Sequence, residues 1–380
     1  MKFTANRAEL LACVRHVLKA VPAKATVDIL TGILIEADSD NCEVVLTGTN
    51  YEAAVQRKNA AAIYRGGSAV LNAVLFSEML RLLKDETVDV DVAQNYLCII
   101  KGGSATYRLS AKPAKDYPKP ELPFPENAIK INNIPIIARN TVYAASRNES
   151  NPAMTGVRLL IKDGVLRACG CDGMRFMEYM RKLESAYSLE TLIPARSLDL
   201  LAGLLKDEDT LDFGVVGNCA VFTKENFMFS ARLLHGNYIN VDAVLGNIKP
   251  QYRAVVDTDK LTNAVDAVRA CVERTGVLKM SFHGNQITLV HDGEAGHSRV
   301  SVDAEVKVEM PGFCFNAEYL YNGLRRLHGN IELCLSSNGI MCVSTDSTRY
   351  FQMSTKPPAP KAEKKIKKKA EKAEKAAKAA

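Results

Sequence analysis

The residues that could do chemistry are dispersed along the chain and form no catalytic pattern. None of the ten cysteines belongs to a CxxC pair, although metal and redox sites commonly use such close spacings. His283, His291 and His297 fall within one predicted hairpin, where we expect them to face solvent. The chain contains neither a GxxxxGKS or GxxxxGKT phosphate loop nor a GxGxxG fingerprint. We therefore expect no catalytic residue, no metal and no cofactor.

One enzyme hypothesis stays open beside this expectation. Cys171 could act as the nucleophile of a thiol-dependent hydrolase with a distant histidine, because nucleophile and base need only meet in the folded chain. It predicts that alkylation of the thiols abolishes a turnover. A non-enzymatic chain predicts no turnover to abolish.

A different chemistry is carried by cations on predicted helices. The helix predicted over residues 6–21, with Asn6 as its N-cap, places Arg7, Arg15 and Lys19 at multiples of four residues, so they form a stripe beside the apolar face. Other predicted helices also carry Arg or Lys at exposed positions, among them Arg139 and Arg147 on one helix. Such side chains can bind a phosphate backbone without reading its sequence. The alternative is a solvated face of each helix.

The net charge of +6 arises at the C-terminal end of the chain. Residues 356–380 hold ten Lys and three Glu, a net charge of +7, so residues 1–355 carry −1. This Lys/Ala-rich segment is too poor in apolar residues to fold alone, and we predict a disordered tail over 357–380. It could add nonspecific DNA contacts or only aid solubility.

The elements that must position these residues occur in three copies. The segment LLKDE at 82–86 returns at 204–208, 122 residues later, and Thr-Gly pairs that open strand–turn–strand segments begin at residues 31, 155 and 275. A helix candidate precedes each Thr-Gly pair, at residues 6–21, 133–146 and 257–272. A period near 120 residues is too long for a solenoid and indicates a triplicated domain. We place the domains at residues 1–125, 126–250 and 251–356.

Composition and the pattern of apolar residues indicate the broad structural class of the chain. Apolar residues make up 47% of the 380 residues and charged residues 24%, which is typical of a globular chain with buried cores. No apolar run is long enough to span a membrane, and the N-terminal segment has no signal-peptide core. Scattered cysteines favour free thiols in a reducing cytoplasm. The predicted helices alternate with segments whose apolar residues recur every two positions, as in strands. This order predicts an α+β fold with antiparallel sheets.

Several of these segments resemble one family, the bacterial sliding clamps, which are the beta subunits of DNA polymerase III. The resemblance runs in order over residues 1 to about 355 and is carried by MKFTANRAELL, AVPAKATVDILTGILIEA, LTGTNYE, GVLRACGCDGMRF, IPARSLDLLAGLL and FNAEYLYNGLRRL. It implies a crescent subunit of three tandem clamp domains, with helices lining one face and sheets on the outside. Two subunits would join head to tail in a homodimeric ring.

The resemblance also implies a function and a set of partners. Double-stranded DNA would thread the ring, which would hold the replicative DNA polymerase on DNA as a processivity factor without chemistry of its own. A separate clamp loader complex would open the ring. Lys24 matches a cation of the family, and further expected DNA contacts on the helices and their loops are Arg7, Arg15, Arg139, Arg147 and Arg196.

The family's pocket for an apolar peptide of its partners is carried over by position. The pocket residues would be Met154, Cys171, Gly173, Met174, Arg175, Phe176, Ile239, Ala243, Val244, Phe351 and Met353. Asp172-Gly173 is a turn signal at a predicted strand end. Met174 stands where the family usually has His, and Ile239 where it usually has Pro. We therefore expect a reshaped pocket, softened by Met174 and Met353.

Ring closure would bring the first domain of one subunit against the third domain of the other. By position, Tyr107 should meet Cys271 and Val272 in an apolar contact, and such a heterologous interface closes after two copies. A competing hypothesis is a nonspecific scaffold for single-stranded nucleic acid or RNA, which predicts a monomer that binds linear single strands tightly.

Overall fold

The computed structural model describes residues 1–120, 124–185, 187–272, 276–293 and 296–356. The predicted tail at 357–380 lies outside these described residues. The chain divides into two compact units, each treated by itself here. The first comprises Met1–Gly170 and Met180–Tyr238, and the second comprises Cys171–Tyr179 and the chain from Ile239 onward.

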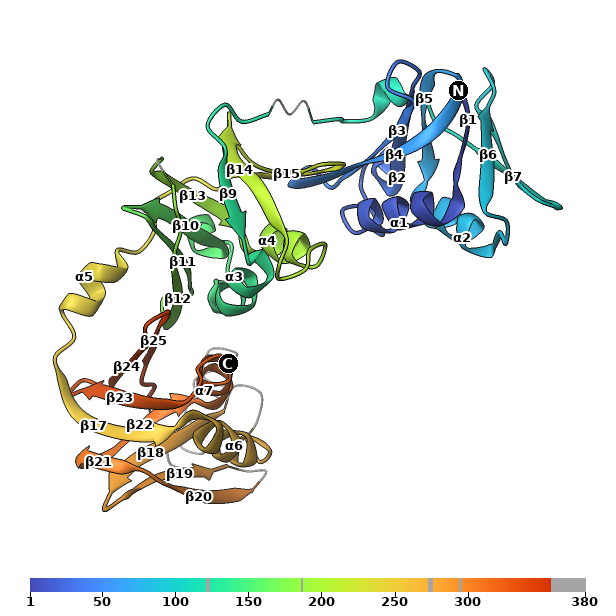
Figure 1. The fold of residues 1–380 in the computed structure, drawn as a ribbon. Helices are drawn as coiled ribbons and strands as arrows, with labels where there is room; N and C mark the ends of the chain where they lie inside the picture. The colour runs from blue at the N-terminus through green and yellow to red at the C-terminus, as the bar shows by residue number, and fades with distance from the viewer. Residues whose placement is uncertain (121–123, 186, 273–275, 294–295, 357–380) are drawn as a thin grey trace, which may run out of the picture. The chain divides into compact units, whose positions relative to one another are not determined.

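Antiparallel sheets dominate the first unit (Figure 1). Its largest sheet has the strand order β8-β7-β6-β1-β4-β16-β15-β14-β9, and off this path β3 pairs with β4, β2 with β3, and β5 with β2. These strands are β1 (Lys2–Asn6), β2 (Gly32–Asp38), β3 (Glu43–Thr49), β4 (Ala53–Arg65), β5 (Gly67–Asn72), β6 (Thr87–Val92), β7 (Leu97–Gly102), β8 (Ala105–Ser110), β9 (Ile129–Asn132), β14 (Thr210–Val216), β15 (Cys219–Lys224) and β16 (Phe227–Arg232). Beside them, β10 (Gly156–Lys162) pairs with β11 (Val165–Cys171) and β13 (Leu189–Pro194).

The second unit holds two antiparallel sheets. One has the order β12-β25-β24-β23-β17-β21 and the other the order β20-β19-β18-β22. The strands are β12 (Arg175–Lys182), β17 (Pro250–Asp257), β18 (Val277–His283), β19 (Gln286–Asp292), β20 (His297–Asp303), β21 (Glu305–Val308), β22 (Met310–Asn316), β23 (Asn330–Ser336), β24 (Ile340–Ser344) and β25 (Thr348–Met353).

Six helices follow strands directly and pack in pairs. In each tandem copy one helix follows the first strand and a second follows a later strand: α1 (Arg7–Leu18) and α2 (Ala73–Leu82), α3 (Ile134–Thr141) and α4 (Ala195–Ala202), α6 (Thr258–Arg269) and α7 (Ala317–Leu324). A seventh helix, α5 (Val241–Gly246), lies outside this pattern. The triplication predicted from the sequence is therefore visible as three helix pairs on antiparallel sheets, an α+β fold.

Local sequence explains where these helices begin. The side chain of Asn6 accepts hydrogen bonds from the backbone N–H groups of Ala8 and Glu9, at 2.9 and 3.1 Å, which confirms the predicted N-cap. Asn72, Asn240, Asp257 and Asn316 cap α2, α5, α6 and α7 in the same way.

The helix predicted over 133–146 is shorter than expected. It ends at Thr141 and a 3-10 turn, η3 (Val142–Ala144), follows. Two β-branched residues in succession, Thr141 and Val142, disfavour continuation, and the Thr141 hydroxyl donates to the carbonyl oxygen of Ile137 at 2.7 Å. Arg147 consequently lies in a loop past the helix, which corrects its assignment to a helix face.

The expectation of solvent-facing histidines is wrong for one of the three. His283 and His297 are exposed, whereas His291 is 7% exposed and its Nδ1 lies 2.8 Å from the carbonyl oxygen of Val277. In β19, His291 continues the alternation of Ile287 and Leu289, so it points to the core face of the sheet.

The core of the second unit includes a close contact between α7 and β25. Tyr350 of β25 is 0% exposed, and its ring packs directly on the backbone of α7 at Gly323. The Tyr350 hydroxyl is held between the carbonyl oxygen of Tyr319 at 2.9 Å and Oε1 of Gln352 at 2.6 Å. All ten cysteines are free thiols. Among the described residues, no helix has the length and apolar character needed to cross a membrane.

Candidate functional site

The predicted DNA-contacting cations near α1 fall into two groups. Arg7 is half-buried and donates from Nε to the carbonyl oxygen of Asp85 at 2.8 Å, just past α2, and from Nη1 to the carbonyl oxygen of Leu80 in the last turn of α2 at 3.4 Å. It therefore joins α1 to α2, because the last carbonyls of a helix need donors. Arg15 and Lys24 are exposed and take part in no ion pair among the described residues. Their charges remain available to a ligand.

Arg139 also has a partner within the protein. On α3, its Nη2 lies 3.1 Å from Oδ1 of Asp207, and both side chains are about half exposed. Asp207 belongs to the second LLKDE segment, as Asp85 belongs to the first. An exposed pair of this kind contributes up to about 1 kcal/mol and exchanges readily with other partners. Asp207 therefore competes with any phosphate for Arg139.

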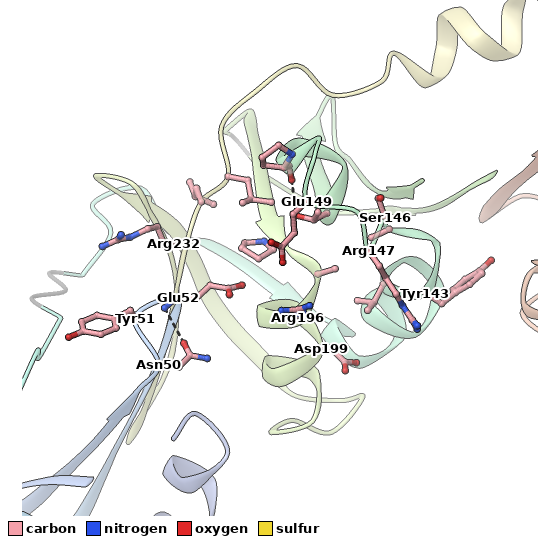
Figure 2. Close-up of a pocket in the computed structure, with 18 residues that line it drawn as sticks. Asn50, Tyr51, Glu52, Tyr143, Ser146, Arg147, Glu149, Arg196, Asp199 and Arg232 are labelled. Carbon is pink, nitrogen blue, oxygen red and sulfur yellow. Dashed lines mark hydrogen bonds between the residues drawn. The ribbon is translucent and has the colours of Figure 1, made fainter. Parts of the chain in front are cut away.

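Arg147 and Arg196 line one pocket of about 790 Å³ in the first unit. Figure 2 shows Arg147 and Arg196 on the side of α3 and α4, and Tyr51 on the side of the turn between β3 and β4. Both arginines are exposed, and neither forms an ion pair within the described part of the chain. The full lining is Asn50, Tyr51, Glu52, Val142, Tyr143, Ala145, Ser146, Arg147, Glu149, Pro152, Thr155, Pro194, Ala195, Arg196, Asp199, Arg232, Leu233 and Leu234.

The turn that borders this pocket is held by the side chains of Asn50 and Thr49. The Thr49 hydroxyl donates to the carbonyl oxygen of Ala53 at 2.9 Å and accepts from the N–H of Tyr51 at 3.1 Å. Oδ1 of Asn50 accepts from the N–H groups of Glu52 and Ala53 at 3.0 and 2.7 Å. Beyond the turn, the N–H of Arg232 donates to the carbonyl oxygen of Glu52 at 2.8 Å, and β16 continues alongside β4. Tyr51 occupies the left-handed region at φ 71°, which non-glycine residues rarely adopt.

The same turn recurs in the second unit and carries the predicted peptide pocket. Oδ1 of Asp172 accepts from the N–H groups of Met174 and Arg175 at 2.9 and 3.0 Å. The N–H of Met353 donates to the carbonyl oxygen of Met174 at 2.8 Å, where β25 runs beside β12. Gly173 has φ 89°, so the predicted Asp-Gly turn is confirmed.

The predicted pocket residues of the second unit combine a buried aromatic pair with exposed thioethers, because Phe176 and Phe351 are only 0% and 6% exposed. The rings of Phe176 and Phe351 stack with centroids 5.0 Å apart and an interplanar angle of 5°. Beside them Met174 and Met353 are 40% and 37% exposed. Flexible thioethers around an aromatic pair can adapt to differently shaped apolar side chains.

Arg175 is occupied inside the protein. Its Nε lies 3.1 Å from Oδ2 of Asp172, and its guanidinium carbon lies 3.7 Å from the centre of the Tyr319 ring. The residue is 8% exposed, so Arg175 does not offer its charge to a ligand. Ile239, Ala243 and Val244 lie on or next to α5 in the same unit, whereas Met154 belongs to the first unit.

The environment of Cys171 does not suit a nucleophile. The residue is 1% exposed, and burial raises the pKa of its thiol to about 11. At pH 7 the reactive thiolate would amount to about one part in 10,000. No cluster of His, Cys, Asp or Glu that could hold a metal ion occurs among the described residues.

The residues expected at a subunit contact lie at sheet edges or just past a helix. Tyr107 is half-buried on β8, which ends its sheet, while Cys271 and Val272 are half-buried just past α6. Sequence reasoning missed a larger apolar surface on α2. There Val74, Leu75 and Leu82 are 56%, 48% and 53% exposed. The signal was the composition of AVLFSEMLRL, which holds more apolar residues than one buried face requires.

Comparisons with known proteins agree with this architecture. A family model described as the N-terminal domain of the DNA polymerase III beta subunit matches residues 1–123, and one described as its central domain matches residues 128–240. The beta sliding clamp of Bacillus subtilis is 29% identical over 360 residues, covering 90% of this chain and 94% of the relative. That of Halalkalibacterium halodurans is 31% identical over 257 residues, covering 63% and 66%.

Solved structures extend the likeness to nearly the whole chain. The crystal structure of the DNA polymerase sliding clamp from Bacillus subtilis has a TM-score of 0.88 at 27% identity, covering 94% of this chain and 100% of that one. The beta subunit from the DNA polymerase of Streptococcus pyogenes, at 21% identity, has the same fold with a TM-score of 0.85 and the same coverage. The chain therefore belongs to the family of bacterial DNA polymerase III beta subunits, the beta sliding clamps.

Proposed function

We propose that this sliding clamp acts as a closed ring of two identical chains, joined head to tail, that encircles double-stranded DNA and tethers the replicative polymerase. The likeness to a DNA polymerase sliding clamp at a TM-score of 0.88 over 94% of the chain carries the proposal. Each chain contributes three domains, at 1–125, 126–250 and 251–356, and a clamp loader complex opens the ring. Encirclement holds DNA by topology, so individual contacts can stay weak and allow sliding.

The proposed DNA contacts divide into primary and secondary groups by their internal partners. Arg15, Lys24, Arg147 and Arg196 are exposed cations without an ion pair among the described residues, so they can face phosphates directly. Arg7 and Arg139 are committed to Asp85 and Asp207 and contribute mainly to the local potential. Contacts of this kind carry no sequence information, which suits a protein that must move along DNA.

The proposed partner site is the face shared by the exposed Met174 and Met353 and the buried rings of Phe176 and Phe351. An apolar peptide side chain would gain roughly 1.5–3 kcal/mol from full burial there, enough to anchor a short motif. The space beside the turn at Gly173 is open, because a Cβ at its position would meet no atom within 4 Å. The replicative polymerase and the clamp loader would use the same face in turn.

Subunit closure would use the free edges of the two units. Tyr107 on β8 would contact Cys271 and Val272 of the second copy, and the exposed apolar residues of α2 would add to the contact. Edge strands offer unpaired backbone groups to a second chain, and β20 ends its sheet as β8 does. The clamp itself would have no catalytic activity, metal or cofactor, in a cytoplasmic setting.

Retention on circular DNA tests the ring directly. The clamp is loaded on a nicked circular duplex with a clamp loader and ATP, isolated by gel filtration, and then treated with a restriction enzyme that cuts the circle once. Release on cutting is expected for encirclement, and uncut circles serve as the control. Unchanged retention on the linear product would refute the ring, and tight binding to linear single strands by a monomer would favour a scaffold.

A further inference from the structure

The short helix α5 carries residues assigned by position to the proposed partner site. Ile239 precedes it, and Ala243 and Val244 lie on it. Residues 233–240, which lead into α5, contain no helix or strand. A six-residue helix on such a connection has little stability of its own. Its position against the sheet therefore depends on contacts made by its side chains.

One of these contacts is an ion pair to the sheet of the same unit. Nη1 of Arg349, on β25, lies 3.1 Å from Oδ1 of Asp242 on α5. The same Nη1 lies 3.5 Å from Oε2 of Glu178 on β12. Glu178 is 2% exposed in its side chain, Arg349 32% and Asp242 60%. One guanidinium nitrogen thus lies between a buried carboxylate on β12 and an exposed carboxylate on α5.

Strand register places this ion pair on the ligand face. Arg349 pairs with Glu178, and two residues further Phe351 pairs with Phe176. Residues two apart on a strand point to the same side of a sheet. Arg349, Phe351 and Met353 therefore share one face, so Arg349 lies beside the stacked rings.

We propose that Arg349 is a positioning residue of the partner site: by binding Asp242 it fixes α5 against the β12–β25 face and thereby sets the affinity for partner peptides. The inference rests on the proposed partner site. Buried Glu178 holds the guanidinium in place, which lowers the entropic cost of the second contact to Asp242. A partly exposed ion pair is weak enough to open, so α5 can adjust to peptides of different size.

The test uses the full chain and a fluorescein-labelled octapeptide whose apolar side chains are Leu and Phe. Fluorescence anisotropy should show about a two- to fivefold loss of affinity for Asp242→Asn, the range expected from an exposed ion pair. Asp242→Glu should restore most of it. The matched control is Asp259→Asn, which removes an exposed carboxylate from the first turn of α6 and should change nothing.

Two further measurements separate positioning from general stability. Hydrogen–deuterium exchange of the α5 amides should rise in Asp242→Asn, while exchange in α6 stays unchanged. Arg349→Lys keeps a positive charge beside buried Glu178, so the unit should stay folded, but the lysine side chain ends one bond short of the Nη1 position and should remain beside Glu178. In that background Asp242→Asn should have a smaller effect on affinity than in the wild type.

The outcomes distinguish this inference from the proposed function. Unchanged α5 exchange in Asp242→Asn overturns the positioning role of the Arg349–Asp242 ion pair, whether or not the peptide binds. If the wild type binds the peptide and Asp242→Asn binds it equally well, that role is also overturned. If α5 exchange rises but the wild type fails to bind the octapeptide, the ion pair stands as a structural contact, while both the partner site and the role of Arg349 in affinity are rejected.

Discussion

The close contact between α7 and β25 makes Gly323→Ala a sharp test of the packing behind the partner face. In an open helix alanine is favoured over glycine by about 1 kcal/mol. Here an added Cβ would lie 2.6 Å from Cε1 of Tyr350 and closer still to Cζ and Cε2. The ring cannot retreat, because Tyr350 is 0% exposed and Tyr319 and Gln352 hold its hydroxyl.

The expected loss of stability follows from these opposing terms. Overpacking costs about 1–3 kcal/mol and more for severe overlap, so after subtracting the helix-propensity gain we expect a net loss of about 2 kcal/mol. For a unit of this size that corresponds to a fall of about 4–8 °C in the melting temperature of the second unit. Differential scanning calorimetry measures it, and hydrogen–deuterium exchange should locate the change in α7 and β25.

Two further variants test whether packing against Tyr350 causes the loss. Gly203→Ala is the matched control, because a Cβ at Gly203 would lie 3.5 Å from the carbonyl oxygens of Asp199 and Leu200, an ordinary contact. It should leave the melting temperature unchanged or raise it. Gly323→Ala combined with Tyr350→Leu should lose less than the sum of the two single changes. If Gly323→Ala alone raises the melting temperature as Gly203→Ala does, the packing argument is refuted.

Three further predictions follow from other sites. Met353→Ser should change the free energy of unfolding by less than about 0.5 kcal/mol, because the side chain is 37% exposed, yet lower the affinity for a labelled apolar peptide; unchanged affinity contradicts the partner site. Iodoacetamide at pH 8 should modify exposed Cys42 well before Cys171, whose pKa burial raises to about 11, as mass spectrometry of peptides can show. The Lys224 ammonium, 2.7 Å from Asp209, holds the pKa of that carboxyl below its usual range. Asp209→Asn should therefore cost up to about 1 kcal/mol in urea unfolding at pH 7, and the difference from wild type should vanish as the pH falls below the lowered pKa.

Local signals in the sequence predicted much of the fold. The Asn6 cap and the Asp172–Gly173 turn depend on residues within three positions of each other, so their geometry can be read from the chain alone. The triplication was visible because short segments recur at a fixed period. The prediction for the helix ending at Thr141 failed at its boundary, where β-branched residues outweigh the apolar periodicity.

The roles of individual charged residues could not be predicted in the same way. Arg7 and Arg139 look like Arg15 in sequence, but their partners Asp85 and Asp207 lie more than 60 residues away along the chain. Only the fold decides which cations are already paired. The same holds for Arg175, whose guanidinium pairs with Asp172 and lies over the ring of Tyr319.

The seam between the first two repeats is made of main chain. Five residue pairs join β4 and β16, from Ala53 with Ala231 to Arg57 with Phe227. These hydrogen bonds join backbone groups, which are the same whatever side chains they carry. Side chains on both faces of this seam can therefore be substituted while the hydrogen bonds remain. That freedom accounts for a chain that keeps its architecture while sharing barely a quarter of its residues with a structural neighbour. It also marks the seam as a poor place for the molecule to bend.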